Sequence, residues 1–191
     1  NTKYFFSKSD EVEEIFDGRE YREVFRDKSV VIFENLHVLP RAFMVYDWEV
    51  INNEQQLLEK LVSTDFNFRE KILLEEPPPL NKNSKKGLYD LSYESYSENE
   101  SSLKINTNRK GLLFVSDTFY PGWKAYVDDK ETKIYKADFS FRSILVPEGE
   151  HEIIFGYEPD SFYNALKVSI ISLIFLLGFS FWLKKKEDYV K

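Results

Sequence analysis

One long apolar segment near the C-terminal end limits the environments in which this chain can fold. Residues 162–183 read FYNALKVSIISLIFLLGFSFWL, with Lys167 as the only charge. A helix of this length spans about 33 Å at 1.5 Å per residue, which exceeds the roughly 30 Å of a bilayer's hydrocarbon core. The alternative is a buried helix of a soluble protein. Such a helix would carry a polar stripe, and residues 168–183 offer only three serines and one glycine for it. The segment is therefore predicted to span a membrane.

The charges around this segment predict its orientation. Lys184, Lys185 and Lys186 follow it directly and begin a basic tail over 184–191. Residues 162–191 carry +3, and because the whole chain carries −7, residues 1–161 carry −10. Basic flanks stay on the cytoplasmic side of a membrane. We therefore expect the acidic body to be extracytoplasmic and the tail to be cytoplasmic.

Residues at both ends of the segment are typical of a membrane–water interface, so the lipid bilayer is the first expected partner. Phe162 and Tyr163 would lie at the outer surface and Trp182 at the inner one. Lys167 is close enough to the outer end for its ammonium group to reach the headgroups. No nucleic-acid partner is expected, because the acidic body has no basic stripe to neutralise phosphates.

The composition excludes several classes of chemistry. The chain has no cysteine and two histidines, which excludes disulfide scaffolds and thiolate sites and leaves no expected metal site. Phosphate-binding glycine loops, dinucleotide fingerprints and zinc-protease motifs are absent from the sequence. We predict no catalytic residue and no cofactor, and we expect this chain not to be an enzyme by itself.

A polar, proline-led loop over residues 77–87 divides the body. Residues 1–76 mix short strands with one helix, expected over 54–62 behind the N-cap residue Asn53, and form an α+β part. Residues 88–160 contain strands roughly 8–12 residues apart with turns between them, which indicates an antiparallel sandwich. Whether the two parts form one core or two stays open. Strands are expected over 4–7, 21–25, 30–33, 42–50, 88–96, 103–105, 112–115, 124–127, 132–136, 139–146 and 151–157.

The predicted fold is therefore mainly β: an antiparallel β-sandwich-like extracytoplasmic domain with one short helix, followed by a C-terminal transmembrane helix. The chain begins at Asn1 without a signal peptide. A body outside the cell needs a means of export, so either a signal was removed or this is the end of a longer membrane protein, and we favour the second reading.

Several motifs in fixed order resemble the YfhO-type family of bacterial membrane proteins. Residues 116–128, SDTFYPGWKAYVD, are similar to the family's most distinctive segment. Asp129 departs from the pattern, because the family usually has Gly there, which changes the turn type but not the hairpin. The other matching segments are FR (141–142), PEGEH (147–151), FGYEP (155–159), KY (3–4), EN (34–35) and LPRAF (39–43).

The resemblance implies a multi-pass protein of the bacterial plasma membrane, similar to GT-C glycosyltransferases that use lipid-linked sugars to build the cell envelope. Such enzymes take the sugar from a polyprenyl-phosphate donor, and their acidic catalytic residue lies in an early outer loop that no position here matches. This chain would then be the C-terminal extracytoplasmic, non-catalytic domain, which shapes the active site or recognises the acceptor glycan. Two alternatives are an independent membrane-tethered carbohydrate-binding or wall-interaction module and a scaffold for a partner protein.

The residues around Pro121 and Gly122 are the candidate glycan contacts: Asp117, Phe119, Tyr120 and Trp123. Sugars stack their C–H faces on aromatic rings, but Pro-Gly also fits a type II turn, and a structural corner is the favoured reading. Arg41 and Arg142 are expected to pair with carboxylates rather than to face a phosphate. His151 follows a glycine-containing turn and is interpreted as a hydrogen-bonded turn residue.

Overall fold

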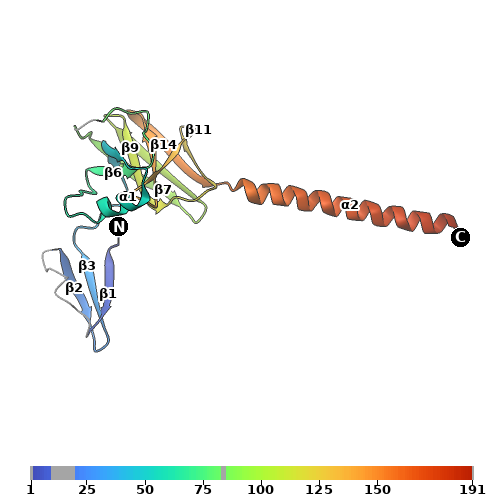
Figure 1. The fold of residues 1–191 in the computed structure, drawn as a ribbon, viewed down its shortest axis with the longest axis horizontal. Coiled ribbons are helices and arrows are strands. Elements are labelled where there is room, and N and C mark those ends of the chain that lie inside the picture. The colour runs from blue at the N-terminus through green and yellow to red at the C-terminus, as the bar shows by residue number, and fades with distance from the viewer. Residues whose placement is uncertain (1, 10–19, 83–84, 191) are drawn as a thin grey trace.

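A computed structural model describes residues 2–9, 20–82 and 85–190. The chain forms a β-rich body, a small sheet that projects from it, and one long helix that leaves it (Figure 1). The predicted mainly β fold is confirmed.

A five-stranded antiparallel sheet forms one layer of the body. Its order is β11-β10-β14-β8-β7. The alternation of apolar and polar residues explains its orientation: Leu103, Ile105, Ile153 and Phe155 are buried, while the residues between them are more exposed. The bounds are β7 (Tyr89–Tyr96), β8 (Glu100–Thr107), β10 (Trp123–Val127), β11 (Lys130–Thr132) and β14 (Gly149–Tyr157).

A six-stranded sheet forms the second layer, in the order β4-β9-β13-β12-β6-β5. All its pairs are antiparallel except β5 and β6, which run parallel and are connected through the helix α1 (Glu54–Leu61). The bounds are β4 (Ala42–Val45), β5 (Asp47–Val50), β6 (Lys71–Leu74), β9 (Gly111–Thr118), β12 (Ile134–Ala137) and β13 (Phe141–Val146). β6 was not predicted, because its apolar run of three residues is too short for a clear alternation.

The two edge strands of this sheet, β4 and β5, are consecutive in the chain and separated only by Tyr46. The sheet therefore curls until its edges meet, and the single strand predicted over 42–50 is divided by a bend. Tyr46 needs room at this bend: a Cβ added at Gly111 would lie 2.7 Å from the Tyr46 ring. The Tyr46 hydroxyl lies 3.3 Å from Thr107 Oγ1 in the other sheet.

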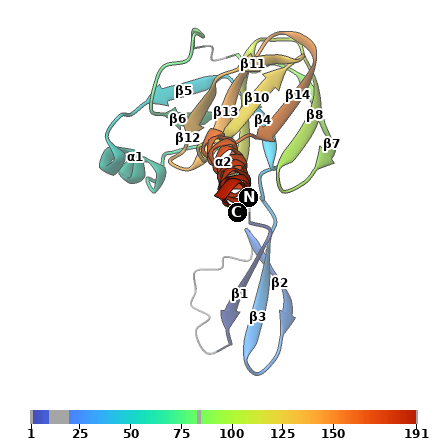
Figure 2. The ribbon, with the colours of Figure 1, turned by 90° about the vertical axis from the view of Figure 1, so that its right-hand side faces the viewer.

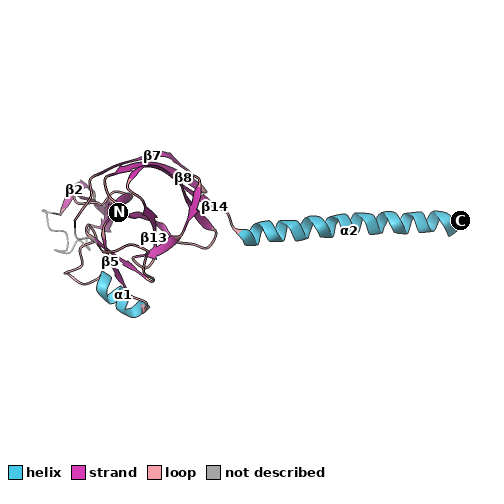
Figure 3. Cartoon of the chain, turned by 90° about the horizontal axis from the view of Figure 1, so that it is seen from above, coloured by secondary structure: helices cyan, strands magenta, loops and turns pink. Residues whose placement is uncertain are grey.

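Two apolar clusters fill the body, and their members show whether the two parts of the chain share a core. The first lies between the two sheets and combines Met44 of β4 with Leu113, Ile144, Ile153 and Phe155. The second lies on the other face of the six-stranded sheet and includes residues from both parts of the chain: Phe43, Val45, Ile72, Leu74, Leu112, Phe114, Tyr135 and Ala137. Residues 42–74 and 88–160 thus share their cores, and Figure 3 shows strands of both segments within one body.

The predicted helix after Asn53 is present and ends one residue early, at Leu61. Asn53 Oδ1 accepts the backbone N–H of Gln56 at 3.0 Å, which satisfies one of the unpaired donors of the first turn. Leu57 and Phe66 pack on Leu73 in a third small apolar cluster. The cap therefore stabilises the first turn of α1, and the apolar face holds the helix against the sheet.

A three-stranded sheet projects from the body (Figures 1 and 2). Its order is β1-β3-β2, with β1 (Tyr4–Lys8), β2 (Tyr21–Arg26) and β3 (Val30–Asn35), all antiparallel. Val31 and Phe33 are buried in it, whereas Phe6 and Phe25 are exposed. The predicted strands over 4–7, 21–25 and 30–33 are thus all present.

The long helix α2 (Asp160–Val190) extends away from the body (Figure 1). Within it, Asp160–Ser180 is the one stretch of the described chain that is long and apolar enough to cross a membrane, and none of it is buried in the body. The hydroxyls of Ser169 and Ser172 donate to the carbonyls of Ala165 and Val168, both at 2.9 Å, so these polar groups are satisfied within the helix.

Candidate functional site

A surface cavity of about 590 Å³ lies at the end of the two-sheet body from which α2 departs. We call it the end cavity. The ends of five strands and one turn contribute side chains to it, because these strands all begin or finish at this end of the sandwich. Its lining includes Ser97, Glu98, Ser101, Asp117, Trp123 and Arg142.

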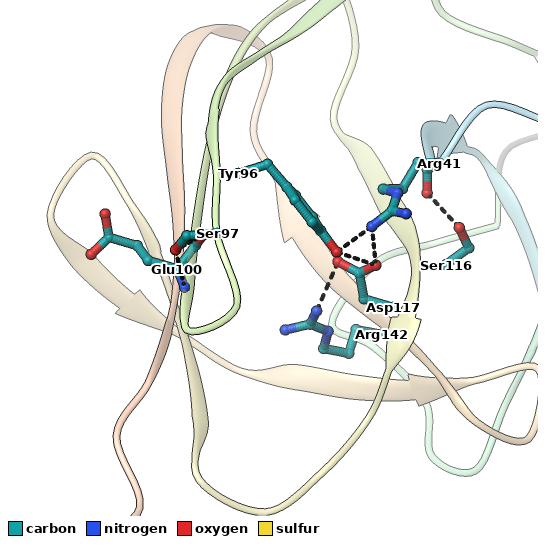
Figure 4. A network of polar contacts seen from close by, with 7 residues as sticks. All are labelled: Arg41, Tyr96, Ser97, Glu100, Ser116, Asp117 and Arg142. Carbon is teal, nitrogen blue, oxygen red and sulfur yellow. Dashed lines mark hydrogen bonds and ion pairs between the residues drawn. The ribbon is translucent and has the colours of Figure 1, made fainter.

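Asp117 is the centre of a network of polar contacts (Figure 4). Its Oδ1 lies 3.1 Å from Arg41 Nη1 and accepts the hydroxyl of Tyr96 at 3.3 Å, and its Oδ2 lies 2.9 Å from Arg142 Nη2. Arg41 Nη1 also contacts the Tyr96 hydroxyl, and its guanidinium lies over the Tyr96 ring, 4.5 Å from the centroid. The expected pairing of both arginines with a carboxylate is thus present, and one carboxylate serves both.

The two arginines differ strongly in burial. The side chain of Arg142 is 3% exposed, whereas that of Arg41 is 45% exposed. The guanidinium of Arg142 lies between two rings, 4.1 Å from the centroid of Trp123 and 5.1 Å from that of Phe155. Burial lowers the pKa of Arg142, and the neighbouring Asp117 carboxylate opposes this shift. Arg142 is therefore held as a desolvated cation at the floor of the cavity.

Several hydrogen-bond donors at this end of the body have no partner. Nε and Nη1 of Arg142, Oγ of Ser101 and the hydroxyl of Tyr93 are buried and unpaired. Burial raises the pKa of Tyr93 to about 12, and the Asp117 carboxylate adds to this shift, so Tyr93 keeps its proton at neutral pH. The described side chains contain one further unpaired buried polar atom, Trp48 Nε1.

The aromatic turn before β10 has the predicted corner geometry. Gly122 has a φ of +104°, and the Trp123 N–H donates to the Tyr120 carbonyl at 3.3 Å, as in a type II turn. Tyr120 is 60% exposed, whereas Phe119 and Trp123 are half-buried. Of the four candidate glycan contacts, Asp117 and Trp123 line the end cavity, and Phe119 and Tyr120 lie in the adjoining turn.

His151 lies at the opposite end of the five-stranded sheet. Its Nδ1 is 2.6 Å from Asp128 Oδ2, and its Nε2 is 3.2 Å from the Glu148 carbonyl oxygen. Asp128 Oδ1 also accepts the Glu152 N–H, and these hydrogen bonds lower the pKa of Asp128. His151 is thus a hydrogen-bonded residue beside a turn, as expected, and takes no part in the end cavity.

A second cavity, of about 380 Å³, lies beside the six-stranded sheet and is mostly apolar. Asp138 lines it, and the Leu73 N–H donates to Asp138 Oδ1 at 2.7 Å. Burial raises the pKa of Asp138 to about 6. No group of three or more metal-ligating side chains occurs in the described part of the chain.

The predicted interface residues lie along α2. Phe162, Tyr163 and Trp182 are exposed, and so is Lys167, within the apolar segment. The side chains of Lys184, Lys185 and Lys186 lie outside the described residues. Phe162 and Tyr163 lie at the end of α2 next to the body, where the membrane–water interface nearest the body would lie.

The sequence reasoning missed several residues of the site and its surroundings, among them Tyr93, Tyr96 and Ser101. A signal for Ser101 exists, since it shares the inward face of β8 with Leu103 and Ile105 at a spacing of two. A polar residue on an inward face is an informative exception to the pattern. Nothing in the local sequence identifies Tyr96 as a partner of Arg41, which is 55 residues away.

The fold and this helix together define a β-rich domain joined to one membrane-compatible helix. Residues 78–169 match the family model described as bacterial membrane protein YfhO, and this region belongs to that family. The matched range contains Asp117, Trp123 and Arg142 but not Arg41. The resemblance predicted from the motifs is confirmed.

One curated relative is the uncharacterized protein YfhO of Bacillus subtilis (strain 168). It is 29% identical over 118 residues, which cover 52% of this chain and 13% of the relative. The chain thus spans a small part of that protein's length. No solved structure matches the chain.

Proposed function

We propose that this chain is the extracytoplasmic, non-catalytic domain, with its membrane helix, of a larger envelope glycosyltransferase that uses a lipid-linked sugar. In this proposal the end cavity recognises the acceptor glycan. The observation that carries the proposal is the combination of a half-buried indole, Trp123, with charged and hydroxyl groups in one cavity beside the start of α2. Such a combination suits a sugar, which offers apolar C–H faces and hydroxyls together.

The family match and the length of the relative support a role within a larger membrane protein. The sidedness rests on the excess of lysine after the apolar segment. Protease added to intact cells should cleave the body of the full-length protein and spare residues 184–191. A body protected from external protease would refute the extracytoplasmic placement.

The glycan role is tested by Trp123→Leu and Trp123→Phe in the full-length protein, expressed in a bacterium that depends on it for envelope glycosylation. Leu removes the stacking surface, and Phe retains part of it. We expect at least a roughly tenfold loss of transferred sugar for Trp123→Leu at unchanged protein level and a smaller loss for Trp123→Phe. Tyr89→Leu, at the far end of the same sheet, is the matched control. Equal transfer by Trp123→Leu and the control would refute glycan recognition at this cavity.

A further inference from the structure

We infer that the end cavity binds a phosphate group, with Arg142 and Ser101 as its donors. The inference goes beyond glycan recognition and does not depend on a transferase activity. It begins from an imbalance between donors and acceptors in this part of the body.

Each of the unpaired groups at this end can donate a hydrogen bond, and the two nitrogens of Arg142 can only donate. They are Arg142 Nε and Nη1, Ser101 Oγ and the Tyr93 hydroxyl, and each is buried. Buried polar groups are almost always hydrogen-bonded in folded proteins, so unpaired donors on two residues that line one cavity indicate a missing acceptor. By contrast, the remaining unpaired atom of the described part, Trp48 Nε1, is isolated in the other apolar cluster.

Asp117 already accepts from three donor atoms, and none of them is one of the unpaired atoms. One of its oxygens faces Arg41 and Tyr96, and the other faces Arg142 Nη2. Figure 4 shows one terminal nitrogen of Arg142 directed at Asp117 and the other pointing away from it. Satisfying this second nitrogen therefore requires an acceptor from outside the network.

The geometry favours a ligand with several oxygens. The donors that line the cavity come from two strands, β8 and β13, so they approach from separate directions. A phosphate ester presents two or three oxygens around one centre, and a guanidinium binds two of them with parallel N–H groups. Arg142 is the desolvated cation of this cavity. Arg41 and Glu98 carry opposite charges and are both exposed, so water screens both.

The position of the cavity leaves two sources for the phosphate. Trp123 pairs with Tyr157 in the sheet, and the Glu158 N–H donates to the Gly122 carbonyl at 2.6 Å, two residues before α2 begins. A ligand in the cavity is thus close to the bilayer surface, where either a lipid headgroup or a soluble phosphate ester can supply the same chemistry.

The test uses the full chain in a neutral detergent at fixed ionic strength, titrated with glycerol phosphate and with inorganic phosphate by calorimetry. Ser101→Ala removes one donor without altering charge and should weaken binding about three- to tenfold. Arg142→Lys keeps the charge, loses the planar fork and should weaken binding by at least about tenfold. Arg26→Gln, which removes an exposed arginine of the projecting sheet, should change the affinity by less than about twofold.

Absence of binding to both probes would overturn the inference and leave ordered water as the partner of the donors. Binding that Ser101→Ala and Arg142→Lys leave unchanged would also overturn it. If Arg142→Lys does not fold, as judged by near-UV circular dichroism, Ser101→Ala decides alone. Repeating the titration in phospholipid nanodiscs identifies the source: a lipid phosphate in the cavity would suppress binding of the soluble ester, and a soluble ligand would bind as in detergent. Because the assay measures binding, it is independent of sugar transfer.

Discussion

Replacing Asp117 by Asn is expected to destabilise the folded body, because it leaves the Arg142 guanidinium buried without a counter-charge. The substitution keeps the size of the side chain and one hydrogen-bonding oxygen. What it removes is the negative charge 2.9 Å from Arg142 Nη2 and 3.1 Å from Arg41 Nη1. The effect therefore measures electrostatics rather than packing.

The magnitude follows from the different burial of the two arginines. At 2.9 Å and an effective dielectric constant of about 20, the gross attraction between Asp117 and Arg142 is about 6 kcal/mol. Breaking a buried pair by removing one partner costs about 3–5 kcal/mol, whereas an exposed pair such as Asp117–Arg41 contributes about 0–1 kcal/mol. Since Asp117 itself is 12% exposed and thus not wholly desolvated, we expect a loss near the lower limit, about 3 kcal/mol.

Thermal unfolding of the chain in neutral detergent, followed by near-UV circular dichroism, measures this loss. For a domain of this size, about 3 kcal/mol corresponds to a decrease in Tm of roughly 6–12 °C. Arg41→Gln is the matched control, because it removes the exposed partner of the same carboxylate. It should cost no more than about 1 kcal/mol.

The double variant Asp117→Asn with Arg142→Met separates the uncompensated charge from general disruption of the site. Met is apolar and fills a similar volume, so the double variant should be more stable than Asp117→Asn alone. Equal losses of stability for Asp117→Asn and Arg41→Gln would refute this origin. So would a double variant whose loss of stability equals the sum of the losses for Asp117→Asn and Arg142→Met alone.

Three further substitutions test other features. Asp129→Gly should stabilise the chain by about 0.5–1 kcal/mol in denaturant unfolding, because Asp129 has a φ of +63°; a destabilised variant would contradict the assigned turn. Burial raises the pKa of Asp138 to about 6, above its value in the unfolded chain. The stability that the protonated Asp138 carboxyl contributes to the folded state is therefore fully present at acidic pH and is lost as the pH rises through about 6. Asp138→Asn should therefore gain up to about 3 kcal/mol over the parent chain at pH 7.5 and nothing near pH 4, and equal gains at both pH values would contradict this origin. Ile174→Arg places a charge in the middle of the apolar segment, which costs about 2.5–3.5 kcal/mol of membrane-insertion free energy. Fractionation after alkaline extraction should therefore show less of this variant in the membrane pellet. Full retention would argue against a span.

The sequence predicts best those elements whose signal is local. The apolar segment, the Asn53 cap and the Pro121-Gly122 turn each depend on a few neighbouring residues, and each is present as expected. The bend at Tyr46 was not predictable, because β4 is buried on both faces by different clusters, so its sequence is apolar at every position up to the bend. Closure of the sheet depends on pairing with β9 and β6, which only the whole fold determines.

The end cavity was predictable only in part. Strand alternation places Asp117 and Val115 on one face of β9, and Arg142 and Ile144 on one face of β13, so both charges are directed inward. Two inward charges of opposite sign are expected to form an ion pair. That Arg41 reaches the same carboxylate, 76 residues away, depends on the arrangement of the strands and has no local signal.

The closure of the six-stranded sheet has a consequence for how the domain behaves beside other copies of itself. Unpaired strand edges are where β-proteins join to one another and aggregate. Because β4 and β5 meet through Tyr46, this sheet offers little free edge, and in the described body the open edges are β7 and β11 of the other sheet. The outer strand β7 carries Asp90 and Glu94, so two such edges repel each other. Crowded on a membrane surface, the bodies of neighbouring copies should therefore not join through β7.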